Sequence, residues 1–299
     1  MSHSEKISIA LDLLFKDLMP SRISDSIRED PEKTIQTLFS IQESALIARD
    51  LFQKPIDGNL LDRYWAYLLF LEEAHFLARK SNLDALSAHY SAAFISLRSV
   101  LELIIKGAYY QCLCNPLLRN SLSSFRQNTK KEKFNNFVKE LNNTIVSENL
   151  QKNSAGLYDE FTKGGINGID LPSFHSMLKD LEKIEMLKGI ENSIHTIYNE
   201  LYRPLSDFVH VHPNKTDTGI TLLAGLDIFE DKKIIKTALL GYMATLHKVM
   251  DVSIVLTLNI LKELLQNEKV KEKVRNHLTD EVLFSDLKYA KEHMYELTS

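Results

Sequence analysis

A run of about thirty residues, from 84 to 113, repeats its apolar side chains with the period of an α-helix. The residues on that face are Leu86, Tyr90, Phe94, Leu97, Leu101, Ile104 and Ala108. An α-helix rises 1.5 Å per residue, so a helix of this length would span about 45 Å. A rod that long needs other elements to cover its apolar side. It therefore predicts the central helix of a bundle.

The composition supports a helical protein throughout. Only 10 glycines and 7 prolines occur in 299 residues, which is low for a β-rich or loop-rich chain, and a hydrophobic fraction of 44% can build a sizeable core. We expect an all-α fold, an elongated multi-helix bundle with long central helices and an inserted helical and loop excursion. The formal net charge of −4 argues against a uniformly basic nucleic-acid binder and leaves a local basic patch open.

Three regions follow from the patterns. Residues 1–114 form an N-terminal helical half, residues 115–170 form an insert rich in Asn, Lys and Gly, and residues 171–299 complete one bundle. The insert is either a solvated excursion or a lid that contacts a substrate. Helices are expected, beside the rod, over 5–19, 31–52, 60–80, 130–149, 155–162, 172–187, 190–202, 231–266, 268–277 and 280–297.

Between the last long helices we expect less regular structure. Pro204 lacks an amide donor, so a kink or restart is expected at Arg203, followed by a turn over 204–211 and a polar loop over 212–219. Residues 220–229 are extended or helical.

Several common classes of protein have no support. Phosphate-binding loops, dinucleotide fingerprints, zinc-protease motifs and nucleophile elbows are absent from the sequence. Cys112 and Cys114 stand too close for a disulfide framework and are expected to be buried thiols in a reducing, cytoplasmic setting. Residues 234–265 are the most apolar stretch, but charges interrupt it, so we expect a buried core helix and no membrane span.

The segment Tyr202–His210 carries the most informative chemistry. Arg203 and His210 are seven positions apart, which on a helix is nearly two turns, so both would lie on one face about 10 Å apart along the axis. Histidine can act as a general base or acid near neutral pH. Arginine can neutralise charge that develops on a phosphoryl oxygen. The pair is chemically competent to cleave RNA without a metal.

This segment resembles the HEPN superfamily, whose members are helical bundles with an arginine, four to six residues and a histidine near a late core helix. Arg203 and His210 match that spacing, and Val209 supplies the apolar residue usual before the histidine. The resemblance implies a metal-independent ribonuclease of a defence or toxin-type system, with Arg203 and His210 as catalytic residues, RNA as substrate and no cofactor. It also implies an active site that is often formed across a homodimer.

Other interpretations of the same residues stay open. Tyr202, Ser206 and His210 are spaced i, i+4, i+8 and would serve equally in a structural polar network within a bundle. In that case the chain is a non-catalytic scaffold that binds a protein partner through an apolar groove. A catalytic site needs Arg203 and His210 exposed together in a cleft. A structural network needs them buried and hydrogen-bonded.

Arg98 and Glu102 form a second group on the rod. They stand at i, i+4 among apolar residues, a spacing at which the two side chains can pair. We expect this pair to face the His210 segment across the bundle and to support the polar network, since a buried charge needs a partner. A salt bridge at the rim of the bundle is the alternative.

Two further patterns concern possible ligands. His210 and His212 form an H-x-H pair, but in a loop that spacing does not specify a metal, and no metal is expected. The cluster Lys130, Lys131, Lys133 and Lys139 with Phe134 and Phe137 would suit single-stranded nucleic acid, or equally an amphipathic helix with Phe inward.

Overall fold

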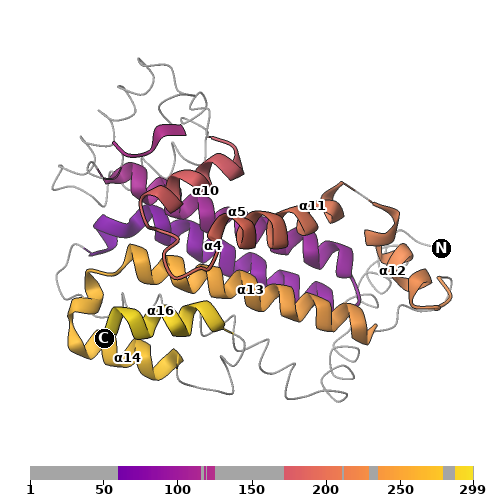
Figure 1. Ribbon diagram of the computed structural model, residues 1–299. Coiled ribbons are helices and arrows are strands. Elements are labelled where there is room, and N and C mark those ends of the chain that lie inside the picture. Colours follow the sequence, from indigo (N-terminus) through magenta and orange to yellow (C-terminus); the bar gives the residue numbers. More distant parts are fainter. Residues whose placement is uncertain are drawn as a thin grey trace, which may run out of the picture.

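The computed structural model describes residues 60–115, 118, 120–124, 172–210, 212–228, 235–278 and 287–298. Of this part 80% is helical, and it contains no strand. The predicted all-α multi-helix bundle is therefore confirmed (Figure 1). The helices expected over 5–19, 31–52, 130–149 and 155–162, and the lysine cluster from Lys130 to Lys139, lie outside the described residues.

The two helices of the N-terminal half, α4 (Leu60–Leu86) and α5 (Tyr90–Cys114), pack along each other. Their boundary was predicted at residues 80–84 and lies instead at 87–89, where Ala88 takes a φ of 62°. Ser81 and Asn82 mislead a sequence-based prediction because they are polar. Both are buried, and both hydrogen-bond the hydroxyl of Tyr242. The helix therefore continues through them.

The third long helix, α13 (Lys236–Ile260), packs against α5 and is the core helix expected from the apolar stretch. Every residue from Val249 to Ile260 is buried. Its bounds are narrower than the predicted 231–266. Among the described helices it alone is long and apolar enough to cross a membrane by length and composition, and 67% of its most apolar window is buried inside the protein. A core helix passes the same test.

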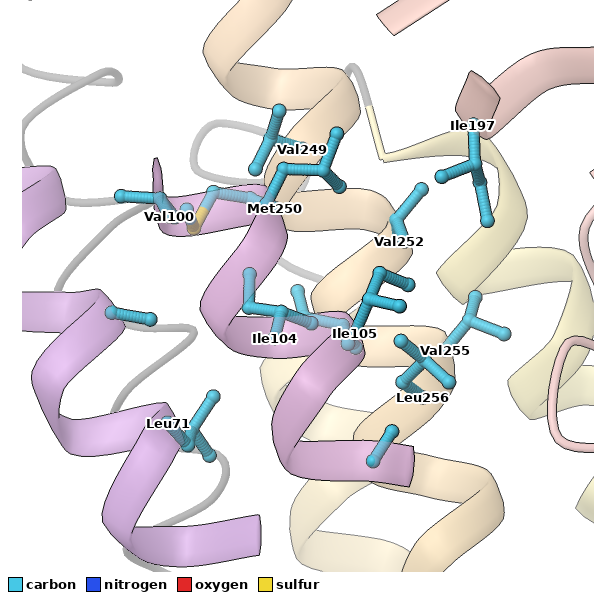
Figure 2. Close-up of a cluster of buried hydrophobic side chains, with 14 of the residues drawn as sticks. Leu71, Val100, Ile104, Ile105, Ile197, Val249, Met250, Val252, Val255 and Leu256 are labelled. Carbon is cyan, nitrogen blue, oxygen red and sulfur yellow. The ribbon is translucent and has the colours of Figure 1, made fainter. Parts of the chain in front are cut away.

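One hydrophobic core joins the early and late parts of the chain. Figure 2 shows Leu71 of α4, Val100, Ile104 and Ile105 of α5, five residues of α13 and Ile197 converging. Several buried polar groups beside this core are paired. For example, the Tyr67 hydroxyl lies 2.8 Å from the Thr257 hydroxyl and 3.3 Å from the Ser253 carbonyl oxygen. Pairing of this kind offsets the cost of burying a hydroxyl.

The segment after residue 172 runs alongside α5 through α10 and α11 (Figure 1). It comprises α10 (Phe174–Lys183), the π-helix η1 (His195–Tyr202), α11 (Arg203–Val209), the 3₁₀ turn η2 (Pro213–Lys215) and α12 (Asp217–Leu223). A new helix starts at Arg203, as Pro204 predicted. The turn expected over 204–211 is wrong, since this stretch is mostly helical.

Pro204 also explains the π-helix before it. In an α-helix the ring of Pro204 would press on the carbonyl group of Glu200 and leave that carbonyl without a donor. The structure avoids this by wider turns, in which the Arg203 N–H bonds the carbonyl of Tyr198, five residues back. Short π-helical segments often occur at functional sites.

The C-terminal helices are η3 (Leu264–Gln266), α14 (Glu268–Leu278) and α16 (Lys288–Thr298). The buried carboxylate of Asp251 on α13 accepts hydrogen bonds from the backbone N–H groups of Tyr289 and Ala290, at 2.9 and 2.7 Å. It thereby caps the start of α16, which begins later than the predicted residue 280. The predicted helix over 268–277 is confirmed.

Candidate functional site

Helix α11 is held against α5 by its inner face. Leu205 and Phe208 are buried, and the Phe208 ring stacks on Phe94 of α5 with centroids 4.3 Å apart. Figure 1 shows α11 lying along α5, on the side away from α14 and α16. Because Leu205 and Phe208 occupy the inner face, residues on the opposite side of the helix point away from the core.

Arg203 and His210 lie at the two ends of α11, and both are exposed. Among the described residues, neither side chain has a hydrogen bond or an ion pair. The guanidinium carbon of Arg203 stands 6.0 Å above the ring of Tyr198. His210 ends the helix with its backbone N–H on the carbonyl of Ser206, 3.0 Å away. These two side chains are therefore open to a ligand. The structural polar network, which needs Arg203 and His210 buried and hydrogen-bonded, does not include them.

The polar network lies behind them. The Arg98 guanidinium donates from Nε to the Ser206 hydroxyl at 3.1 Å and from Nη2 to the Tyr202 hydroxyl at 2.8 Å. The Tyr202 hydroxyl donates to Glu102 at 3.1 Å, and Arg98 pairs with Glu102 at 2.9 Å. Four side chains named from the sequence thus form one closed set that ties α5 to η1 and α11.

Two arrangements were expected for Arg98 and Glu102, a pair that faces the His210 segment and a salt bridge at the rim of the bundle, and the network has features of both. Their side chains are 21% and 22% exposed, so the pair is partly buried, and it is bonded to the α11 segment at the same time. Lys106 reaches the second oxygen of Glu102 at 3.8 Å. His210 is outside the network, although it continues the i, i+4, i+8 spacing from Tyr202 and Ser206. The network positions α11, and Arg203 and His210 remain exposed outside it.

Aromatic rings extend the site toward α10. Phe174 stacks on Tyr202 with centroids 4.0 Å apart, Tyr202 stacks on Tyr198 at 5.6 Å, and His175 contacts Tyr198 at 4.6 Å. Sequence reasoning did not single out His175, because nothing in the spacing links residue 175 to residue 198. The only signal was Ser173, whose hydroxyl caps α10 and places His175 in the first turn.

Beyond α11 the chain carries further polar groups. His212 is exposed, and the Lys215 ammonium lies 5.0 Å from the Phe208 ring centroid. In the part of the chain that the structure describes, no group of three His, Cys, Asp or Glu residues is arranged to hold a metal ion. Cys112 is buried and is not part of a disulfide.

The arrangement can hold and protonate an anionic group. Arginine offers fixed donors to phosphate oxygens, and histidine transfers protons near neutral pH. Asp207 stands between them on the same helix, four positions after Arg203 and three before His210.

Comparison of the chain with protein-family models, with curated proteins and with solved structures finds no significant match.

Proposed function

We propose that this protein is a metal-independent endoribonuclease of the HEPN type. The observation that carries the proposal is the pair Arg203 and His210, exposed at the two ends of one helix with no competing partner among the described residues. The opposite face of that helix is anchored by Phe208 and by the Arg98 network. A rigid helix that presents one arginine and one histidine to solvent suits the binding and cleavage of a phosphodiester.

In this mechanism Arg203 binds the phosphate and stabilises the charge that grows on its oxygens. His210 takes a proton from the attacking hydroxyl or gives one to the leaving oxygen. Tyr202 and Ser206 act at a distance from the phosphate, since their hydroxyl groups are occupied by Glu102, Arg98 and the backbone carbonyl of Tyr202. Their role is to hold α11 in place.

The separation of Arg203 and His210 favours a site shared by two copies of the chain. Seven helical residues span about 10 Å along the axis, which is long for two side chains to meet at one phosphorus atom. In a homodimer, Arg203 of one protomer would act with His210 of its partner. Mixing Arg203→Ala and His210→Ala protomers should then restore cleavage, because the mixed dimer regains one intact site. Two inactive variants that stay inactive after mixing would contradict the shared site.

Cleavage of total RNA by the purified protein in EDTA tests the proposal. We expect the wild type to cleave and His210→Ala, folded to the same extent by circular dichroism, to lose the activity by a factor of about 100 or more, as for a lost acid–base group. His212→Ala is the matched control, since His212 is an exposed histidine two residues away, and it should stay active. No cleavage by the wild type would refute the proposal. We further propose that this activity belongs to a defence or toxin-type system, as the resemblance implies, and that the protein acts in the cytoplasm.

A second function has one observation in its favour. Leu222 and Leu223 of α12 are 57% and 75% exposed, and exposed apolar groups of this kind often mark protein–protein contacts. On this alternative the chain is a non-catalytic scaffold. A wild type that leaves RNA intact, together with an oligomer that Leu223→Ser dissociates in analytical ultracentrifugation, would favour the scaffold over the nuclease.

A further inference from the structure

Two side chains without hydrogen-bond partners meet at the ring of Tyr198. His175, from α10, has its ring centroid 4.6 Å from that of Tyr198, and the guanidinium carbon of Arg203 lies 6.0 Å from the same centroid. Neither side chain has a hydrogen bond or an ion pair within the part of the chain that the structure describes. Two groups that can both donate to an anion thus contact one aromatic ring, although 27 residues separate them in the chain.

The position of His175 is fixed by its neighbours. The Ser173 hydroxyl accepts the N–H of Ser176 at 3.2 Å and starts α10. Phe174 then stacks on Tyr202 with an interplanar angle of 11°. These contacts anchor the first turn of α10 on the π-helix, so His175 has to lie beside Tyr198. A side chain held in this way loses little further freedom when it binds a ligand.

One ring nitrogen of His175 is available to a ligand. Its Nδ1 atom is enclosed and has no hydrogen-bond partner among the described residues. An enclosed N–H without an acceptor is costly, so the neutral ring keeps its proton on Nε2. Nε2 is then a donor, and an oxygen of an anionic ligand is the acceptor that suits it.

The order of the groups along the helix defines what such a ligand looks like. Tyr198 precedes Arg203 by five residues, and His210 follows Arg203 by seven. His175 and His210 are therefore on opposite sides of Arg203 along the helix axis. A polyanion bound at Arg203 would therefore meet His175 next along η1, on the side of Arg203 away from the His210 of the same chain.

We propose that His175 binds the phosphate next to the scissile one, beside Arg203, so that the substrate is an RNA strand with at least two consecutive phosphodiesters. This inference rests on the proposed function. His175 is a binding residue here and transfers no proton, which separates its role from that of His210. Single-stranded RNA fits best, because its backbone can follow a helix surface that a rigid duplex touches at only a few points.

Binding of a cleavage-resistant 2′-O-methyl oligonucleotide, followed by fluorescence anisotropy, tests the site without any need for activity. His175→Phe keeps the ring packed on Tyr198 and removes the donor, and it should weaken binding about tenfold. The matched control is His195→Ala, because His195 is an exposed histidine on η1 that pairs with Glu200, and this variant should bind as the wild type does. Equal affinities of wild type and His175→Phe would overturn the inference, as would a wild type that does not bind the oligonucleotide.

Cleavage kinetics provide the second test. With a dinucleoside monophosphate, which has only the scissile phosphate, His175→Phe should match the wild type. With a longer oligonucleotide the variant should show a raised KM and a kcat within about twofold of the wild type, as expected when uniform binding is lost. A variant that lowers kcat on both substrates overturns the inference. A wild type that binds the 2′-O-methyl strand through His175 but cleaves no RNA refutes the proposed function and leaves this binding site standing.

Discussion

Arg98 on α5 donates a hydrogen bond from Nε to the hydroxyl of Ser206 on α11, 3.1 Å away and 108 positions along the chain. This bond, with the Phe94–Phe208 stack, joins the segment that carries Arg203 and His210 to a central helix of the bundle. The contribution of these contacts to the stability of the protein can be measured separately from any activity.

Replacing Arg98 by alanine should destabilise the protein by about 1–3 kcal/mol, because Ser206, Tyr202 and Glu102 all lose a charged partner. In a double-mutant cycle with Ser206→Ala, chemical denaturation should give a coupling energy of about 0.5 kcal/mol or more. The pair Glu102 and His210 is the control. Since His210 lies outside the network, their effects should add; coupling between them would show that His210 belongs to it.

His75 on α4 should make the fold sensitive to acid. It is buried, neither ring nitrogen has a hydrogen-bond partner in the part of the chain that the structure describes, and burial lowers its pKa from 6.5 to about 4. Between pH 6.5 and pH 4 the unfolded chain takes up a proton at His75 that the folded state does not. The free energy of unfolding is therefore at its full value above pH 6.5 and decreases as the pH falls toward 4. The loss amounts to about 3 kcal/mol at most. His75→Leu should remove it, as measured by urea unfolding at pH 7 and pH 4.5. An unchanged slope of stability against pH would contradict the buried neutral imidazole.

Asp251 should have the opposite effect on the pH dependence of stability, since it stabilises the fold at low pH. Burial raises its pKa from 3.8 to about 6, although the N–H groups of Tyr289 and Ala290 lower it. The folded state therefore holds a proton that the unfolded chain releases. The corresponding stabilisation is complete below pH 4 and is lost as the pH rises through 6, by about 3 kcal/mol at most. Asp251→Asn has no such titration, so the free energy of unfolding of the wild type relative to this variant should fall between pH 4 and pH 7. A constant difference would exclude the raised pKa.

A glycine is required at position 189 for two reasons, the backbone conformation there and the closeness of a neighbouring side chain. Its φ is +97°, and a Cβ there would stand 2.4 Å from Cγ of the His293 ring. We expect Gly189→Ala to cost about 3 kcal/mol or more in thermal or chemical unfolding. Gly225→Ala is the matched control, because its φ is +72° and nothing lies within 4 Å of the added Cβ. It should cost only about 1 kcal/mol of backbone strain. Equal costs would show that the His293 contact does not matter.

The long helices and the polar network could be predicted from the sequence, because both depend on the helical spacing of residues along the chain. Arg98 and Glu102 stand at i, i+4 among apolar residues, and Tyr202 and Ser206 repeat that step, so a contact between the two pairs was a reasonable prediction. The boundary between α4 and α5 was not accessible, because Ser81 and Asn82 only become good helix residues once Tyr242 is beside them. His175 was missed for a similar reason, since the packing of α10 alone brings it to Tyr198.

The π-helix before Pro204 has a consequence for how this site can change. A turn closed by i→i+5 bonds holds one residue more than an α-helical turn, and one residue corresponds to a rotation of 100° about the axis. Because the π-helix takes up this extra residue, the following helix keeps its orientation, whereas winding His195–Tyr202 as an α-helix with no residue removed would swing the following helix by that angle. Ser206 would then turn away from Arg98, and the side chains now in solvent would be carried toward α5. The outward orientation of Arg203 and His210 therefore depends on the π-helical winding of the segment before them as much as on their own identity.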